Sequence, residues 1–372
     1  MRPIPTLIVG GGPAGASAAI VLARAGATHV LVERSRETGD AICGGFLSWR
    51  TLESLARLGV EPSALGAARI TRTRIIAGER VIEAALPRPA LGVSRRTLDT
   101  VLLARAVAAG AAVERGVTVR SLEGTTASLD DGAALASDTL FLASGKHDVR
   151  GAARPAEARG DDPVLGLRIR LAAAPGLTRL IGDAVELHLF DRGYVGINLQ
   201  EDNSANVCMA VHRSAMLAAG SPAALLDALA QQYPRLGERL AYRSGSEAID
   251  AIANVPYGWR ATHGVGGLFR LGDQAGVIPS LAGEGMGIAI ASGLRAAHAF
   301  RGGGAAAAPR FPRDFARATR RPIALAGLVR DAAERPRVTL AALPLLSHIP
   351  RLIDTIASLT RIGHSPLDDS PR

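Results

Sequence analysis

The chain has 372 residues, a formal net charge of +9 and a hydrophobic fraction of 48%. This size and apolar content are sufficient for one large α/β domain with an insertion, or for two joined domains. Two cysteines are too few for a disulfide framework, and no apolar run reaches the roughly 20 residues that a membrane-spanning helix requires. Because the N-terminal residues also lack a secretory pattern, we expect a cytoplasmic protein with at most peripheral membrane contact.

The positive charge is carried almost entirely by arginines that are spread along the chain, with few aromatic residues beside them. Nucleic-acid-binding proteins instead cluster their basic residues on one face or along one helix. We therefore expect no nucleic-acid partner, and we interpret the charge as composition bias with a minor use in binding anionic cofactors. Lysine occurs once, at Lys146, which makes that position a candidate for a specific role.

The N-terminal segment has the pattern of a strand, a glycine-rich turn, a helix and a second strand. An apolar run at residues 6–9 leads into Gly10-Gly11-Gly12-Pro13-Ala14-Gly15, and an alanine-rich helical stretch follows to about Ala25. A second strand at residues 28–32 then ends at Glu33. This order is typical of the dinucleotide-binding βαβ unit.

Each part of this unit has a physical role. Gly10 permits the tight exit from the strand, Gly12 lets the backbone approach a pyrophosphate, and Gly15 lets the helix pack closely on the sheet. The helix N-terminus offers free N–H groups and a partial positive charge to phosphates. Glu33 can accept hydrogen bonds from both hydroxyls of an adenosine ribose and would repel a 2′-phosphate. The sequence therefore predicts FAD or NAD rather than NADP at this site.

The remaining elements alternate between helical and strand patterns. Residues 49–143 predict, in chain order, a helix at 49–58, two antiparallel strands within 69–93, a helix opening at Ser94, strands at 111–114 and 117–122, a hairpin at 128–135 and a buried strand at 139–143. Residues 161–271 predict strands at 164–171, 185–190, 193–199, 206–212, 249–255 and 268–271, with one helix at 221–240. We expect residues 302–310 to be a surface connector, followed by helices.

A second glycine-rich segment follows the strand at 268–271. This strand places Asp273 just beyond its C-terminal end, where an acid can hydrogen-bond polyol hydroxyls. Pro279 and the glycines at 283 and 285 then form a loop that opens a helix at Met286. The N-terminus of that helix can stabilise negative charge on a reduced flavin ring.

With these motifs the chain resembles the FAD-dependent oxidoreductase superfamily of para-hydroxybenzoate hydroxylase-type monooxygenases and geranylgeranyl reductases. Residues 272–286 are similar to its second FAD motif, in which the acid binds the ribityl chain. Arg95, with Leu98 and Asp99, resembles the arginine that meets the FAD phosphates. The resemblance covers residues 1 to about 300 in three ordered motifs.

The resemblance implies an α/β fold with a discontinuous Rossmann FAD domain of the glutathione-reductase type. We expect this FAD-binding domain to comprise residues 1–68, 94–160 and 260–300. Residues 69–93 and 161–259 would form an inserted antiparallel β-sheet substrate domain, and residues 301–372 a C-terminal helical region. Ligand would lie outside the carboxyl ends of the parallel strands, between the two domains.

The predicted FAD contacts come from both glycine-rich segments and from the loops between them. They are Gly10, Gly12, Pro13, Ala14, Gly15, Glu33, Arg34, Cys43, Gly44, Arg95, Gly272, Asp273, Pro279, Gly283, Gly285 and Met286. We expect no metal site, because the His and Cys residues lack ligand spacing.

Three residues are candidates for catalysis. Cys43-Gly44-Gly45 is similar to the reductases' Cys-Gly segment near the flavin, although Cys43 could equally be a small buried hydrophobe. Tyr194 is what remains of the reductases' aromatic signature. Its side chain could face the substrate cavity, or it could simply pack in the sheet. Lys146 lies in the middle motif, where Ser144 replaces the acid of the hydroxylases; a contact at the sheet edge is the simpler interpretation of Lys146.

These features predict a FAD-dependent oxidoreductase of secondary metabolism. The leading hypothesis is a monooxygenase that hydroxylates an aromatic or polyketide-like lipophilic small molecule with NAD(P)H and O₂. The alternatives are a geranylgeranyl-reductase-like flavoprotein that reduces isoprenoid double bonds, and a non-catalytic flavin-binding module. No second G-x-G-x-x-G motif occurs, so NAD(P)H is expected to bind transiently near the flavin. We expect a monomer or a homodimer.

The C-terminal stretch at residues 338–359 is strongly apolar and is interrupted at Pro344 and Pro350. It could cover a lipophilic pocket, touch a membrane or pack onto the body of the protein. We prefer the last interpretation.

Overall fold

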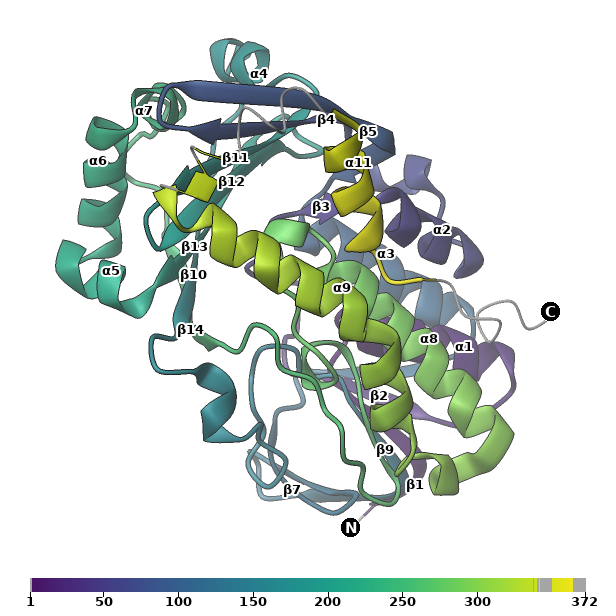
Figure 1. Cartoon of the computed structure of the whole chain (residues 1–372). Helices are drawn as coiled ribbons and strands as arrows, with labels where there is room; N and C mark the ends of the chain where they lie inside the picture. The colour runs from purple at the N-terminus through teal and green to yellow at the C-terminus, as the bar shows by residue number, and fades with distance from the viewer. Residues whose placement is uncertain (1, 337, 340, 342–349, 364–372) are drawn as a thin grey trace.

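The computed structural model describes residues 2–336, 338, 339, 341 and 350–363. These residues form two sheets, each covered by helices, with a long helix crossing between them (Figure 1). Residues 340 and 342–349 of the apolar stretch predicted at residues 338–359, including Leu343, Pro344 and Ile349, lie outside the described residues. Among the described residues, no helix combines the length and the apolar character needed to cross a membrane.

The first sheet is parallel at its centre and has the order β6-β2-β1-β9-β8-β7, with β15 paired to the C-terminal part of β9. Strands β6, β2, β1, β9 and β15 run parallel, whereas β7, β8 and β9 form an antiparallel meander. The strands are β1 (Arg2–Val9), β2 (Val30–Glu33), β6 (Ala112–Arg115), β7 (Val119–Glu123), β8 (Thr126–Leu129), β9 (Ala134–Leu142) and β15 (Leu268–Arg270). The predicted Rossmann-type α/β fold is confirmed.

Three helices cover one face of this sheet: α1 (Pro13–Arg24), α3 (Arg95–Ala108) and α8 (Gly285–Gly303). Helix α1 packs against both of the others, and small residues allow the close approach. A Cβ added at Gly293 of α8 would lie 2.2 Å from the Ala14 carbonyl oxygen of α1. Below the helices, the rings of Phe141 and Phe269 stack with centroids 4.8 Å apart. Close helix packing thus places the N-terminus of α1 beside the middle of α8.

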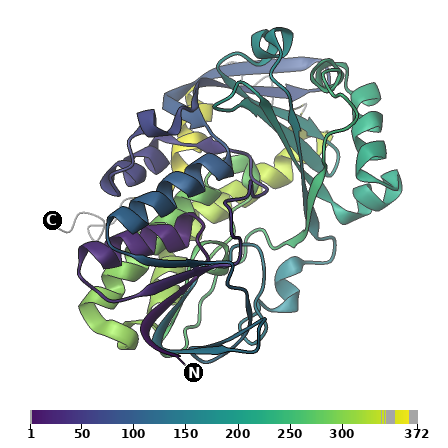
Figure 2. The same cartoon turned by 180° about the vertical axis from the view of Figure 1, so that it is seen from behind.

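The second sheet has the order β14-β10-β13-β12-β11-β4-β5-β3, and its pairs are antiparallel except for β11 with β4. Helices α4 (Pro175–Ile181), α5 (Arg213–Ala219), α6 (Pro222–Gln232) and α7 (Pro234–Leu240) pack on one face (Figure 2). The strands are β3 (Phe46–Leu47), β4 (Ala68–Ala77), β5 (Arg80–Gly92), β10 (Val164–Leu171), β11 (Ala184–Phe190), β12 (Gly193–Leu199), β13 (Ala205–His212) and β14 (Asp250–Val255). The sequence analysis expects residues 1–68 in the FAD-binding domain. The short strand β3 lies within that range but pairs with β5 of the second sheet.

Two sequence predictions are wrong in detail. The single helix predicted at residues 221–240 is two helices, because Pro234 lacks an N–H and disfavours the helical conformation at Tyr233, whose φ is −121° and ψ 90°. The surface connector predicted at residues 302–310 is mostly helical. Helix α8 continues to Gly303, a 3-10 turn spans Gly304–Ala307, and α9 (Phe311–Ala333) begins soon after, consistent with the high helix propensity of the alanines.

The remaining helices join the two halves of the molecule. Helix α9 crosses the front of the molecule from the first sheet toward the second, and α11 (Pro350–Leu359) packs near β5 (Figure 1). Helix α2 (Trp49–Arg57) packs against α8. Short 3-10 turns complete the described elements: η1 (Pro62–Leu65), η2 (Ala156–Arg159), η3 (Gly272–Gln274), η4 (Ser280–Ala282) and η5 (Gly304–Ala307).

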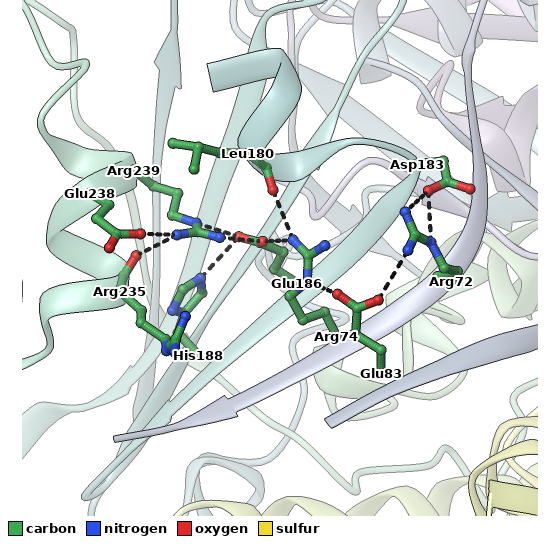
Figure 3. Close-up of polar contacts among 10 residues, drawn as sticks. All are labelled: Arg72, Arg74, Glu83, Leu180, Asp183, Glu186, His188, Arg235, Glu238 and Arg239. Atoms are coloured by element: carbon green, nitrogen blue, oxygen red, sulfur yellow. Dashed lines mark hydrogen bonds and ion pairs between the residues drawn. The ribbon is translucent and has the colours of Figure 1, made fainter. Parts of the chain in front are cut away.

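A buried ion network fixes the second sheet to α7 (Figure 3). The Glu186 carboxylate of β11 is fully buried and accepts two hydrogen bonds from Arg239, at 3.0 and 2.9 Å. Arg74 of β4 and His188 of β11 donate to the same carboxylate. Burial alone would raise the pKa of Glu186, but the hydrogen bonds from His188 and Arg239 lower it to about 2. The carboxylate is therefore ionised, and it links β4, β11 and α7.

Candidate functional site

One large cavity, of about 910 Å³, is lined by residues from both sheets. Val9, Glu33 and Ala143 line it where β1, β2 and β9 end, so the cavity opens at the carboxyl edge of the parallel strands. This is where open α/β sheets bind their ligands. The cavity continues from there to the inner face of the second sheet, where Ile75 and Val185 line it.

Two glycines in the turn after β1 are sterically required. Gly10 has a φ of +106°, and a Cβ added there would lie 2.4 Å from the Ala143 carbonyl oxygen. A Cβ at Gly15 would lie 1.9 Å from the Gly10 carbonyl oxygen. Gly12 differs, because among the described residues an added Cβ would meet only the Arg95 Nη2, at 3.2 Å. Gly12 thus borders open space in the cavity, as close approach of a ligand to the backbone requires.

The N-terminus of α1 faces this space without a side-chain cap from the described residues. Gly12 is the N-cap and Pro13, which has no N–H, is the first helical residue. The N–H groups of the following residues are left for a ligand, and the helix dipole favours an anion there.

The Glu33 carboxylate lies at the other side of the turn. Its Oε2 accepts a hydrogen bond from the Gly11 N–H at 2.7 Å, and its Oε1 accepts one from the Ser35 N–H at 2.9 Å. These two bonds fix the carboxylate at the cavity edge and leave lone pairs for further donors. The neighbouring Arg34 also lines the cavity, and its Nη2 lies 3.2 Å from the His147 Nε2.

Arg95 brings a positive charge to the same end of the cavity. It is the first residue of α3, which Ser94 caps by accepting a hydrogen bond from the Thr97 N–H at 3.1 Å. The guanidinium donates to both carboxylate oxygens of Asp99, at 2.9 and 2.7 Å. Burial would lower the pKa of Arg95, but the charge and hydrogen bonds of Asp99 outweigh it and raise the pKa above its ordinary value. Arg95 is therefore a fixed cation beside Gly12.

Asp273 and Lys146 meet beyond the end of β15. The Lys146 Nζ lies 3.6 Å from the Asp273 Oδ2 and donates a hydrogen bond to the Ile42 carbonyl oxygen at 3.4 Å. Burial would lower the pKa of Lys146, but the charge of Asp273 raises it. Lys146 is therefore a bound cation that links three loops and lines the cavity.

The loop that carries Cys43 and Gly44 is clamped onto the second sheet. The Asn206 Nδ2 donates to the Cys43 carbonyl oxygen at 3.0 Å, and the Val93 N–H donates to the Gly45 carbonyl oxygen at 2.8 Å. Gly45 has a φ of +68°, and an added Cβ would lie 2.5 Å from the Gln200 Nε2. These contacts hold Cys43 and Gly44 at the cavity wall.

The second cysteine, Cys208 of β13, also lines the cavity. Burial raises the pKa of its thiol to about 12, so Cys208 is protonated at neutral pH. Both cysteines of the chain thus face the same space.

The loop between Pro279 and Met286 forms another part of the cavity wall. Gly283, Gly285 and Met286 line the cavity, whereas Pro279 is buried and does not line it. Gly283 has a φ of +63°, and a Cβ there would lie 2.8 Å from the Phe46 ring. Helix α8 begins at Gly285 without a side-chain cap from the described residues, so its N-terminal N–H groups are available to a ligand.

Glu284 precedes this helix and is fully buried. It accepts hydrogen bonds from the Ser48 hydroxyl at 2.9 Å and from the Arg361 Nη1 at 3.0 Å. Arg361 also donates to the Ala282 carbonyl oxygen and lies over the Trp49 ring, with its Cζ 5.1 Å from the centroid. The sequence analysis missed this cluster because Glu284 and Arg361 are 77 residues apart and belong to no motif.

The far part of the cavity is mainly apolar and is enclosed by the second sheet, α9 and residues near α11. Its lining includes Ile75, Leu86, Val185, Leu187, Met209, Ile252, Val255, Leu281, Ala326, Val329, Ile356 and Ala357. The sequence indicated a lipophilic pocket but could not name these residues, because they come from distant strands and helices.

Tyr194 is buried and does not line the cavity itself. Its hydroxyl contacts the Ser280 hydroxyl, which does line the cavity. Tyr257, another lining residue, places its hydroxyl 2.5 Å from the same Ser280 Oγ.

Of the residues predicted for the site, Gly15, Pro279 and Tyr194 support the cavity from behind and the others line it. Ser280, Tyr257 and Arg361 were not predicted.

Residues 3–143 match the family model of an FAD-binding domain. This match agrees with the FAD-binding domain that the sequence predicts for the N-terminal part of the chain. Among curated proteins, none has significant sequence similarity to the chain.

Solved structures share the fold of this chain over nearly its whole length. A flavoprotein/dehydrogenase from Cytophaga hutchinsonii has a TM-score of 0.76 at 17% identity, covering 96% of this chain and 93% of that one. The halogenase PltM in complex with phloroglucinol and FAD has a TM-score of 0.71 at 14% identity, and the match covers 98% of this chain and 89% of that one. A geranylgeranyl bacteriochlorophyll reductase-like protein from Thermoplasma acidophilum has a TM-score of 0.66 at 20% identity, and the match covers 99% of this chain and 95% of that one.

The residues around the cavity fit FAD. The open space at Gly12, the uncapped α1 N-terminus and Arg95 suit a pyrophosphate, and Glu33 suits the adenosine ribose. Asp273 suits the ribityl hydroxyls, and the α8 N-terminus suits the flavin ring. Within the described residues, no group of three or more His, Cys, Asp or Glu side chains is placed to hold a metal ion.

Replacing Asp273 with alanine is expected to weaken FAD binding about tenfold to a hundredfold, because a carboxylate partner of the ribityl hydroxyls is lost. The dissociation constant is measured by titrating the apoprotein with FAD and following flavin fluorescence. Asp161→Ala, which changes an exposed carboxylate, is the control and should leave binding unchanged. Equal affinity of the Asp273 variant and the wild type would contradict this role of Asp273.

Proposed function

We propose that this flavoprotein is a monooxygenase that hydroxylates an aromatic or polyketide-like lipophilic small molecule with NAD(P)H and O₂. The supporting observation is the continuity of the cavity: the part that fits FAD opens directly into the apolar part beneath the second sheet. At about 910 Å³ the whole cavity lies at the large end of the usual range for small-molecule sites. A lipophilic substrate and the flavin would thus share one enclosed space.

The chain's own residues would bind FAD, place the substrate and exclude water from the cavity. Arg95, the α1 N-terminus and Glu33 would hold the adenosine diphosphate part of FAD, and Asp273 and the α8 N-terminus would fix the flavin end. Bound FAD supplies two-electron redox chemistry and the reaction with oxygen. The apolar walls from the second sheet and α9 would place the substrate and exclude water from the reacting atoms.

The pyridine nucleotide has no separate domain within the described residues, so we propose that it reaches the flavin transiently through the open side of the cavity. The expected assembly remains a monomer or a homodimer. A non-catalytic flavin-binding module is the least favoured alternative, because a binding module has no need of an apolar chamber of this size beside the flavin.

A specific observation favours a second candidate, the reduction of isoprenoid double bonds. Cys43, whose segment is similar to that of the reductases, lines the cavity and is held there by Asn206. A thiol at that place can donate the proton that accompanies hydride transfer to a double bond. Hydroxylation does not require this thiol, so the two candidates make different predictions for a Cys43 variant.

Oxygen uptake by the FAD-loaded protein separates the candidates. With NADPH or NADH, a panel of phenolic and polyketide-like compounds is expected to contain one that stimulates uptake at least about tenfold and is recovered with one added oxygen atom. A prenylated compound that is saturated under anaerobic reduction would instead overturn the monooxygenase in favour of the reductase. Cys43→Ala provides the second measurement: oxygen uptake should persist, whereas a reductase should lose about a hundredfold or more of its rate.

A further inference from the structure

The outer face of α9 carries a dense run of arginines. Residues 310–330 contain six arginines and a single acid, Asp314. No other helix among the described residues contains more than three arginines. Residues three or four apart share one face of a helix, so the exposed arginines of this run form one stripe. This arginine stripe consists of Arg310, Arg313, Arg317, Arg320 and Arg321.

The arginine stripe has almost no acidic partner within the described residues. Only Arg317 has one, Asp314 at 3.4 Å, and both of these side chains are mostly exposed. The other four arginines make no hydrogen bond or ion pair through their side chains there. Like charges at this spacing destabilise a helix. An anionic surface lying along α9 would relieve that repulsion.

The same helix separates the outside of the molecule from the apolar part of the cavity. Its inner face is buried, with the Phe311 ring 5.6 Å from that of Phe269 in β15. Further along, Ala326 and Val329 line the cavity, whereas Leu328 between them is 69% exposed. Leu328 lies seven residues after Arg321, about two helical turns, so it continues the stripe. Figure 1 shows α9 crossing the front of the molecule.

Charge and apolar character together indicate the kind of partner. The phosphates of a nucleic acid would pair with the arginines but would gain nothing from an exposed leucine. The surface of an anionic bilayer suits both, because its headgroups attract arginine and the layer beneath them accepts apolar side chains. A bilayer on this face would also adjoin the wall of the apolar cavity.

We infer that the arginine stripe and Leu328 bind the protein to an anionic lipid bilayer, with α9 lying on the headgroup surface. The partner is a lipid surface rather than a substrate, so the inference goes beyond the proposed function and does not depend on it. The proposed function would gain from it, since lipophilic compounds concentrate in a bilayer.

Co-sedimentation of the FAD-loaded protein with vesicles tests the inference. Vesicles of equimolar phosphatidylglycerol and phosphatidylcholine are expected to bind the wild type at least about tenfold more tightly than pure phosphatidylcholine. Raising the salt from about 0.1 M to about 0.5 M should release most of the protein, because screening shortens the reach of the charges. Affinity for the anionic vesicles should fall about a hundredfold or more in a quadruple variant. Its changes are Arg313→Gln, Arg317→Gln, Arg320→Gln and Arg321→Gln.

The matched control removes the same net charge from exposed arginines elsewhere. Its changes are Arg69→Gln, Arg120→Gln, Arg150→Gln and Arg179→Gln. This control should keep most of the affinity for anionic vesicles. Equal losses in the two quadruple variants would show an effect of net charge alone and would overturn the inference.

A fluorescent side chain reports whether α9 itself meets the bilayer. In Leu328→Trp the emission, read as the difference from the wild type, is expected to shift to shorter wavelength when anionic vesicles are added. Leu217→Trp on α5 is the control, because Leu217 is 68% exposed and lies outside the stripe, and its emission should not shift. This readout keeps the arginines, so it decides the question even where the α9 quadruple variant fails to fold.

Four further outcomes overturn the inference. They are a wild type that does not prefer anionic vesicles, an α9 quadruple variant that binds them like the wild type, equal emission shifts at positions 328 and 217, and tighter binding of the stripe to duplex DNA than to vesicles. Vesicle binding by a protein that oxidises and reduces no substrate would support the inference and count against the proposed function alone.

Discussion

Replacing Gly12 with alanine is expected to give a folded protein that has lost most of its affinity for FAD. The added Cβ would approach only the Nη2 of Arg95 among the described residues, at 3.2 Å, and the end of that side chain can shift. The same methyl group would occupy the space through which a pyrophosphate approaches the backbone. We expect the dissociation constant of FAD to rise about a hundredfold or more, measured by titration of the apoprotein.

Two glycine variants show whether the effect is local. Gly302→Ala adds a methyl group that meets nothing within 4 Å and should change neither folding nor FAD affinity. Gly15→Ala would place its Cβ 1.9 Å from the Gly10 carbonyl oxygen, so it should disturb the fold itself and lower the thermal midpoint. A Gly12 variant that unfolds like the Gly15 variant, or one that binds FAD normally, would contradict the role assigned to Gly12.

Replacing Arg239 with methionine is expected to lower the free energy of unfolding by about 3 kcal/mol at neutral pH, because the buried Glu186 carboxylate loses a bidentate partner. Denaturant unfolding measures the change. The comparison variant is Arg243→Met, whose partner Asp227 is 62% exposed. Since exposed ion pairs contribute little, that variant should differ from the wild type by less than about 1 kcal/mol.

The pH dependence follows from the lowered pKa of Glu186. Burial opposes ionisation, but the hydrogen bonds from His188 and Arg239 lower the pKa from 4.5 to about 2 in the folded protein. The ionised carboxylate therefore stabilises the fold fully above pH 4.5, and this stabilisation is lost as the pH falls toward 2. The difference between wild type and Arg239→Met should shrink over that interval. A difference that grows as the pH falls would show that Glu186 is not the group responsible.

The sequence by itself determined the half of the cavity that fits the adenosine diphosphate part of FAD. Gly10, Gly12, Glu33 and Arg95 belong to short motifs. The two glycines act through their backbone, and the two charged side chains stand at the end of β2 and at the start of α3. The local spacing of residues therefore specifies the geometry. Asp273 was found in the same way, because an acid just after a parallel strand must lie at the carboxyl edge of the sheet. Most elements were predictable for the same reason. The exceptions are the break between α6 and α7 at Pro234, the helical residues 302–310, and helices α4 and α5, which were not predicted.

The tertiary structure alone decided the shape and polarity of the apolar part of the cavity. Asn206 holds Cys43 across 163 residues, Tyr194 meets Ser280 across 86, and Arg361 meets Glu284 across 77. No spacing rule relates such pairs, because their approach depends on how two sheets and the C-terminal helices pack. Tyr194 shows the difference clearly: the sequence left it open between the cavity and sheet packing, and in the structure it lies behind Ser280 and does not line the cavity. The physical reason is that motifs encode contacts within a segment, whereas a cavity is formed by side chains from many segments.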